Sequence, residues 1–237
     1  RAYDMSTQCQ LPDDGGELRW GDELAVDGLD IRPSGDLAFW HTRRRSGELD
    51  AEWQRLGVDP QKPILGLTVV SWNFPDHPDS AYLAALEALV KRANSDDRYQ
   101  VVVFNQVSFD LPAADQLADR CPGVIIDRFE REAALLATMI SRCEIFVGSR
   151  FHSCIFSLLG NVPTLAITYL PKTEGIMADL GLGSYSLPIA TIRPEELLRK
   201  YDELVENKAA ISGLLMDSVP RYRQERGQFL SDIPTWI

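Results

Sequence analysis

The stretch that decides the fold is Val147-Gly148-Ser149-Arg150-Phe151-His152-Ser153, where a strand is expected to give way to a helix. Before it, residues 143–147 form a short apolar run with β-favouring side chains. After it, apolar residues recur at helical spacing, at Ile155, Phe156, Leu158 and Leu159. Arg150 and His152 are therefore predicted at the carboxyl end of a strand. In an open α/β sheet ligands bind at that edge, because helix N-termini converge there with free N–H groups.

The relative placement of Arg150 and His152 depends on where the helix begins. Alternate side chains of an extended chain project to the same side, so both could address one ligand if Ser153 is the N-cap. If Ser149 is the N-cap instead, the two side chains diverge by roughly 200° around the helix, since each residue turns about 100°. Both alternatives stay open at this point.

From Pro63 onward, apolar runs of strand length alternate with helical patterns. Strands are expected at residues 64–70, 99–104, 124–126, 143–147 and 163–168, with helices between them and further helices from 175 and from 194. This alternation predicts βαβ units and an α/β fold with a doubly wound, mostly parallel, Rossmann-like sheet. Right-handed crossovers put all strand ends on one edge, so the loops after the first, fourth and fifth strands could share a cleft.

Composition excludes some classes of function. The chain has 237 residues, a net charge of -11 and a pI near 4.8, which argues against nucleic acid as a partner. An acidic protein that binds an anion must concentrate its cations locally, and this demand falls on Arg150 and Lys172. No zinc-ligand spacing is found, so no metal is implied.

The cysteines and the apolar runs bear on location. Four cysteines without CxxC spacing (Cys9, Cys121, Cys143 and Cys154) are typical of reduced residues in a cytosolic protein. No apolar run approaches the length of a transmembrane segment, and residues 1–20 lack a signal-peptide core. We therefore expect a cytoplasmic protein. Because it starts at Arg1, we expect the sequence to be incomplete or processed.

Three runs carry a resemblance to a known family. Gly148–Ser153, then Gly160–Lys172, then Leu180-Gly181 together resemble the C-terminal signature of the polysaccharide pyruvyl transferase family. The resemblance implies a two-domain enzyme of the GT-B type. Such an enzyme transfers the enolpyruvyl group of phosphoenolpyruvate to hydroxyls of a sugar or lipid-linked glycan, forms a pyruvate ketal and releases phosphate. Phosphoenolpyruvate is then a donor substrate, and no cofactor is implied.

The resemblance also suggests a division of the chain. Residues 1–60 would be an N-terminal segment and linker left from a first domain. Residues 61–212 would be the Rossmann-like donor-binding domain, similar to the C-terminal half of a GT-B fold. Residues 213–237 would form a C-terminal helix that packs back toward the first domain. The oligomeric state stays open.

Five residues in or just after the two main runs receive roles. By resemblance Arg150, with Ser149 beside it, binds phosphoenolpyruvate, and arginine offers a planar cationic fork for an anionic group. His152 suits a general acid or base, because transfer requires a proton on the methylene carbon of the donor. Lys172 lies near a helix start, where a cation is unfavourable unless an anion lies between it and the helix. It could instead pair with Glu174 or extend into solvent, and Glu174 could orient the acceptor hydroxyl or act as a base.

Arg19 is the last candidate. Arg19 followed by acidic residues, and later Asp36-Leu-Ala-Phe39, are similar to elements that close the first domain in the family, which places Arg19 in the substrate site. A surface ion pair explains Arg19 equally well.

Two other functions compete with pyruvyl transfer. One is a GT-B glycosyltransferase that uses a nucleotide sugar, although Leu182 stands where a second glutamate, eight residues after Glu174, is often found in such enzymes. The other is a non-catalytic module that binds a small anion or a partner protein.

Overall fold

The computed structural model describes residues 35–41, 45–71, 79–95 and 98–232. Its centre is a six-stranded parallel sheet in the order β3-β2-β1-β4-β5-β6. The strands are β1 (Ile64–Leu67), β2 (Gln100–Phe104), β3 (Ile125–Asp127), β4 (Ile145–Gly148), β5 (Thr164–Thr168) and β6 (Ser186–Pro188). This order is that of a doubly wound Rossmann sheet, and it confirms the predicted fold class. The order reverses between β1 and β4, so the predicted ligand edge lies at the topological switch point.

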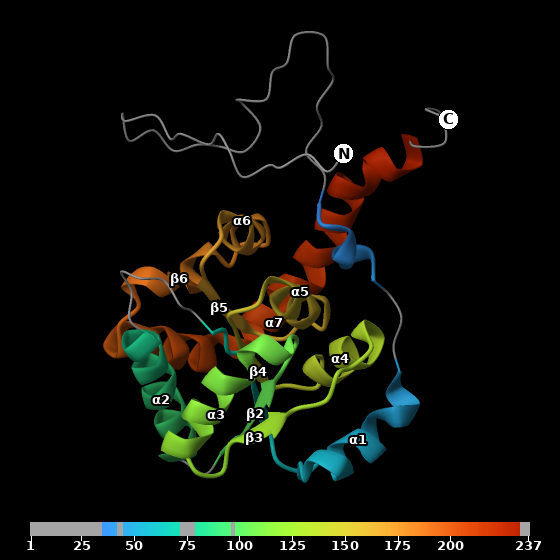
Figure 1. The fold of residues 1–237 in the computed structure, drawn as a ribbon. Helices are drawn as coiled ribbons and strands as arrows, with labels where there is room; N and C mark the ends of the chain where they lie inside the picture. The colour runs from blue at the N-terminus through green and yellow to red at the C-terminus, as the bar shows by residue number, and fades with distance from the viewer. Residues whose placement is uncertain (1–34, 42–44, 72–78, 96–97, 233–237) are drawn as a thin grey trace, which may run out of the picture.

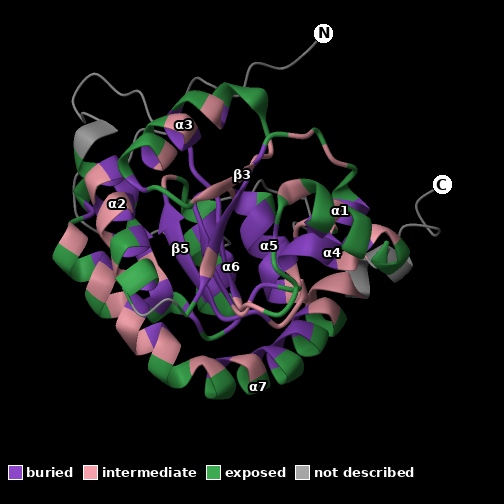
Figure 2. Ribbon diagram, turned by 90° about the horizontal axis from the view of Figure 1, so that it is seen from below, coloured by how far each residue is buried: buried purple, intermediate pink, exposed green. Residues whose placement is uncertain are grey.

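Helices cover both faces of the sheet. On one face, α2 (Asp79–Ser95) packs against α3 (Leu111–Arg120) and α7 (Pro194–Asp232). On the other, α4 (Ala133–Ile140) packs against α1 (Leu49–Leu56) and α5 (Phe151–Leu159), and α5 contacts α6 (Pro171–Asp179). Figure 2 shows α2 and α3 on one side of the sheet and α1 and α4 on the other. Short 3₁₀ helices complete the chain: η1 (Leu37–Trp40), η2 (Ser46–Glu48), η3 (Ser108–Asp110), η4 (Gly183–Tyr185) and η5 (Ile189–Thr191).

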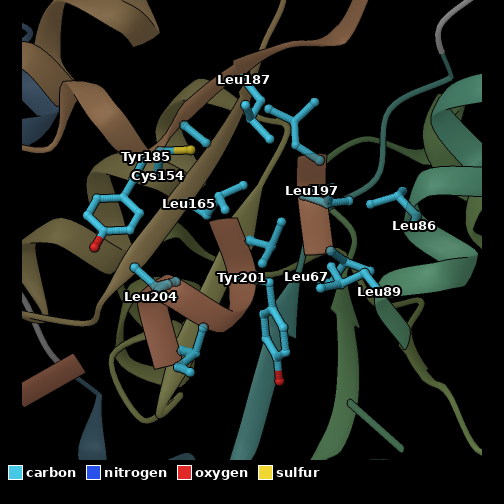
Figure 3. Close-up of a cluster of buried hydrophobic side chains, with 14 of the residues drawn as sticks. Leu67, Leu86, Leu89, Cys154, Leu165, Tyr185, Leu187, Leu197, Tyr201 and Leu204 are labelled. Carbon is cyan, nitrogen blue, oxygen red and sulfur yellow. The ribbon is translucent and has the colours of Figure 1, made fainter. Parts of the chain in front are cut away.

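The central strands are apolar on both faces, as expected of a parallel sheet covered on both sides. Leu65 and Leu67 of β1 belong to the cluster shared with α2 and α7, whereas Phe146 of β4 belongs to the cluster shared with α1 and α4. Figure 3 shows side chains of β1, α2 and α7 meeting in the first cluster, among them Leu67, Leu89 and Leu204. Three of the four cysteines, Cys121, Cys143 and Cys154, are free, as expected of reduced residues, and buried; Cys9 lies outside the described residues.

The last helix differs from its prediction. α7 runs for 39 residues and passes through Gly213, so the boundary that the sequence suggested there falls inside one helix. Its far end lies beside η1, where the ring centroids of Tyr222 and Phe39 are 4.6 Å apart and Arg223 Nε donates to the carbonyl of Phe39 at 2.6 Å. Figure 1 shows the blue η1 segment next to the red end of α7. No helix among the described residues is both long and apolar enough to span a membrane.

Candidate active site at the carboxyl edge of the sheet

The start of α5 places Arg150 and His152. Arg150 is the N-cap and has an extended backbone (φ -109°, ψ 131°), whereas His152 is already the second residue of the helix. Both predicted N-caps are therefore wrong: neither Ser149 nor Ser153 takes that position. The Ser153 hydroxyl instead donates to the carbonyl of Arg150 at 2.7 Å. Arg150 thus lies just before the helix and His152 in its first turn, and the two side chains contact different residues.

Arg150 is engaged with a protein carboxylate. Its Nε donates to Asp110 Oδ2 at 2.8 Å and its Nη2 to Asp110 Oδ1 at 2.7 Å, while Nη1 donates to the Tyr169 hydroxyl at 3.3 Å. Asp110 is only 2% exposed and also accepts the N–H of Ser71 at 2.9 Å. Asp110 thus occupies two N–H groups of the arginine fork, and the predicted contact of Arg150 with phosphoenolpyruvate stays a prediction. The Arg150 side chain remains 26% exposed.

Ser149 lies inside the protein. Its hydroxyl is 2.7 Å from that of Tyr82, and its N–H donates to Thr68 Oγ1 at 2.9 Å. The Thr68 hydroxyl is in turn 3.1 Å from that of Ser153. Burial raises the pKa of Tyr82, so this hydroxyl stays protonated as a member of the network. The Ser149 side chain is thus buried among these hydroxyls, and its predicted contact with the substrate stays a prediction.

Lys172 and Phe151 bring the starts of two helices together. Lys172 is the second residue of α6, which begins at Pro171 and not at Gly175 as predicted. Its Nζ lies 4.1 Å from the centroid of the Phe151 ring, and Phe151 is the first residue of α5. Glu174, in the same first turn, accepts a hydrogen bond from Thr168 Oγ1 at 2.7 Å. The Lys172 ammonium group thus lies near the starts of α5 and α6. The first backbone N–H groups of each helix have no hydrogen-bond partner within that helix.

His152 is the exposed member of the site. Its ring centroid is 5.3 Å from that of Phe151, and its side chain is 56% exposed. Its Nε2 lies 3.9 Å from Oδ2 of Asp36, whose other oxygen accepts the N–H of Ala38 at 2.9 Å and caps η1. His152 also borders a hollow of ≈ 670 Å³, of which Arg150 is not a lining residue. His152 and Lys172 thus each lie beside the Phe151 ring, and His152 also lies near Asp36, whereas Arg150 is paired with Asp110.

One predicted residue of the site is not described by the structure, and three residues of the site were not predicted. Arg19 lies outside the described residues. Asp110 was not singled out; it precedes the helix-starting Leu-Pro as an N-cap would, but its carboxylate makes no capping hydrogen bond and pairs with Arg150 instead. Tyr82 and Thr68 gave no signal, because both occur in apolar patterns that fit a core. Within the described ranges, no group of three or more His, Cys, Asp or Glu side chains is placed to hold a metal ion.

Solved structures with this fold include enzymes that act on sugars. The chain is similar to ADP-heptose LPS heptosyltransferase II of E. coli (TM-score 0.51, 14% identity, covering 70% of this chain and 54% of that one). It is also similar to a glycosyltransferase of Rickettsia africae (TM-score 0.52, 11% identity, covering 83% and 54%). At these identities the likeness concerns the fold alone. It supports the likeness to half of a GT-B fold.

Comparison of the sequence with those of known proteins gives information beyond the fold. The amylovoran biosynthesis protein AmsJ of Erwinia amylovora is 24% identical over 110 residues, which are 46% of this chain and 26% of that protein. The chain thus matches about a quarter of this curated relative and about half of the solved chains named above. A family model described as polysaccharide pyruvyl transferase matches residues 22–171, which include η1, the first five strands and the run from Gly148 to Pro171. On this match over more than half of its length, the chain belongs to the polysaccharide pyruvyl transferase family.

Proposed function

We propose that this protein transfers the enolpyruvyl group of phosphoenolpyruvate to hydroxyls of a polysaccharide or lipid-linked glycan, forming a pyruvate ketal and releasing phosphate. The observation that carries the proposal is that His152 and Lys172, at the starts of α5 and α6, both lie beside the Phe151 ring. These residues lie at the topological switch point of the sheet. Phe151 and His152 are inside the family match, and Lys172 directly follows its last residue.

The donor is an anion with a phosphate and a carboxylate. Lys172 offers one cation, and the first N–H groups of α5 offer the positive end of a helix. Arg150, held by Asp110, keeps the end of β4 and the start of α5 in place and turns its Nη1 toward Tyr169. Arg19, from the segment before η1, is proposed as a further cation for the donor.

The reaction assigns His152 the role of general acid. Protonation of the methylene carbon of phosphoenolpyruvate leaves a cationic carbon two, which a first sugar hydroxyl attacks while losing its proton. Departure of phosphate regenerates a cationic carbon, and a second hydroxyl closes the ketal. Of the two hydroxyl protons, one restores His152 and the other passes by way of Glu174 to the departing phosphate or to solvent. Glu174, exposed in the first turn of α6, is proposed to accept a hydroxyl proton.

Donor binding tests the proposal directly. Stabilisation by mass action raises the melting temperature only for a ligand that binds the folded state, and reaches about 2.7 kcal/mol at a hundredfold excess over Kd. We expect phosphoenolpyruvate to stabilise the chain and UDP-glucose to leave it unchanged. The opposite pattern would establish the glycosyltransferase alternative, and stabilisation by neither compound would refute the proposed donor.

His152→Ala tests the chemistry. Loss of a positioned acid typically lowers turnover by roughly 10²–10⁴-fold. We expect that loss in phosphate release from phosphoenolpyruvate, measured with a glycan acceptor, while circular dichroism and the melting temperature stay as in the wild type. Arg199→Ala, an exposed change on α7, serves as control. A wild-type rate in His152→Ala would remove this histidine from the mechanism.

A further inference from the structure

A hollow that His152 lines, and Lys172 does not, adjoins the candidate active site. It has a volume of ≈ 670 Å³ and lies between η1, the loops after β2 and β3, and helices α4 and α5. The residues used below are Trp40, His41, Gln106, Arg131, His152 and Phe156, all of which line it. Since β2, β3 and β4 are parallel, these loops all lie at the carboxyl edge, and His152 is common to the hollow and to the proposed donor site.

Two side chains that line this hollow each carry a buried polar atom without a hydrogen-bond partner. Arg131 is 3% exposed, and its Nε and Nη1 donate to Asp127 and Glu52, but its buried Nη2 donates to nothing in the described part of the protein. Nε2 of His41 is likewise buried and unpaired. Buried polar atoms are nearly always satisfied, so two such atoms on side chains that line one hollow point to a ligand whose entry turns these side chains toward it.

The charges around Arg131 indicate what kind of ligand this is. Asp127 and Glu52 balance the guanidinium of Arg131 and that of Arg55, whose Nη1 lies 3.7 Å from Glu52 Oε2, so no excess positive charge remains to attract an anion. The unpaired N–H of Arg131 needs an acceptor, while Nε2 of His41 can donate or accept according to its tautomer. Hydroxyl groups of a neutral molecule meet both needs, since a hydroxyl donates and accepts.

The remaining wall is aromatic. Phe156 of α5 is buried at 6% exposure, the His41 ring lies 6.0 Å from it between ring centroids, and Trp40 is half-buried. Sugar rings combine apolar C–H faces with hydroxyl edges, and pockets for such ligands pair aromatic walls with a few polar groups. We infer that this hollow binds the acceptor sugar, a neutral ring of the glycan, and presents its hydroxyls to His152. The inference rests on the proposed function.

Binding of small neutral glycosides to the full chain tests this assignment. The probes are methyl β-galactopyranoside, methyl α-glucopyranoside and methyl α-mannopyranoside, followed by saturation-transfer NMR and by titration of ¹⁵N-labelled protein. His41→Phe keeps a ring and removes Nε2, and Gln106→Ala shortens a half-buried lining side chain. Asn207→Ala, which removes an exposed amide on α7, is the matched control. Phosphoenolpyruvate is titrated against every variant in parallel.

We expect at least one glycoside to bind the wild type and Asn207→Ala equally, and to bind His41→Phe and Gln106→Ala at least fivefold more weakly. Phosphoenolpyruvate should bind all four proteins alike. Absence of glycoside binding to the wild type, or equal glycoside affinity in all variants, overturns the assignment. Failure of phosphoenolpyruvate to bind any of them, with the glycoside pattern retained, refutes the proposed donor and leaves the sugar site standing.

Discussion

Asp110 and Arg150 join the loops at the carboxyl edge of the sheet. The Asp110 carboxylate accepts from Arg150 and from the N–H of Ser71, and Arg150 reaches Tyr169 beyond β5. A nearly buried carboxylate needs such partners, because an unpaired charge in a low-dielectric setting is costly. This pair therefore holds the loops after β1, β2, β4 and β5 in one arrangement.

Asp110→Ala should strongly destabilise the protein. Removing one partner of a buried ion pair costs roughly 3–5 kcal/mol, and we expect about 2–3 kcal/mol here because Arg150 is partly screened by solvent. Urea denaturation measures the loss. The double variant Asp110→Leu/Arg150→Met, which removes both charges, should recover part of it. A double variant less stable than Asp110→Ala would contradict this account of the pair.

Lys172→Gln should separate stability from donor binding. The change removes a cation from the first turn of α6, which is favourable, and a cation–π contact with Phe151, which is unfavourable. The two effects are each below about 1 kcal/mol and opposite in sign, so the free energy of unfolding should change by less than about 0.5 kcal/mol. Phosphoenolpyruvate affinity, measured by calorimetry, should fall about tenfold as one charge-assisted contact of 1.4 kcal/mol or more is lost.

The control for Lys172 is Lys91→Gln, an exposed lysine on α2. It should leave the affinity for phosphoenolpyruvate unchanged. Equal affinities in both variants would exclude Lys172 from the donor site.

At the scale of elements, the contact between β4 and α5 is set by Gly148. A Cβ atom on this last residue of β4 would lie 2.5 Å from Sγ of Cys154 and 2.9 Å from Cε1 of Phe146. The glycine thus lets α5 sit directly on the strand that leads into it. That close approach positions the start of α5, and with it His152.

Gly148→Ala should cost roughly 1–3 kcal/mol of stability, the usual range for overpacking a core. Cys154→Ala removes the nearest clashing atom, so the double variant should be more stable than the sum of the two single changes. Gly213→Ala is the control, because it adds a methyl group to an exposed position of α7 with no atom within 4 Å. It should stabilise the protein by about 0.5–1 kcal/mol. Strict additivity of Gly148→Ala and Cys154→Ala would disprove the proposed clash.

At the scale of the whole molecule, the protein should lose stability at alkaline pH because buried thiols ionise less readily in the folded state than in the unfolded state. Burial raises the pKa of Cys154 from 9.0 to about 12, and it raises that of Cys143 as well. Each thiol is favoured in its protonated form in the folded state. Its contribution is complete below the unfolded value and is lost as the pH rises from about 9 toward the folded pKa.

The free energy of unfolding should therefore fall by roughly 1.4 kcal/mol per pH unit above pH 9 for each such thiol. Urea titrations at pH 8, 9.5 and 10.5 measure this slope. Cys154→Ala should reduce this slope by the contribution of one thiol, whatever the substitution does to the free energy of unfolding at pH 8. An unchanged slope in this variant would show that Cys154 ionises equally easily in both states.

The periodic parts of the chain were the predictable ones. Five of the observed strands and the helices between them lie where apolar runs and helical spacing placed them, because burial on both faces leaves a strong pattern. β6 (Ser186–Pro188) was missed, since three residues at a sheet edge carry too little pattern. α7 was divided at Gly213, because one glycine weakens a helix locally while packing against α2, α5 and β5 sustains it.

By itself the sequence determined that the chain alternates strands and helices, that the run from Gly148 to Ser153 lies at a strand's carboxyl end, and which family it resembles. Only the tertiary structure decided the partners: Asp110 for Arg150, Tyr82 for Ser149, and Phe151 for Lys172. The physical reason is that local patterns reflect burial and backbone geometry along the chain. A charged or hydroxyl side chain instead bonds whichever group the folded sheet brings next to it, and those groups come from distant loops.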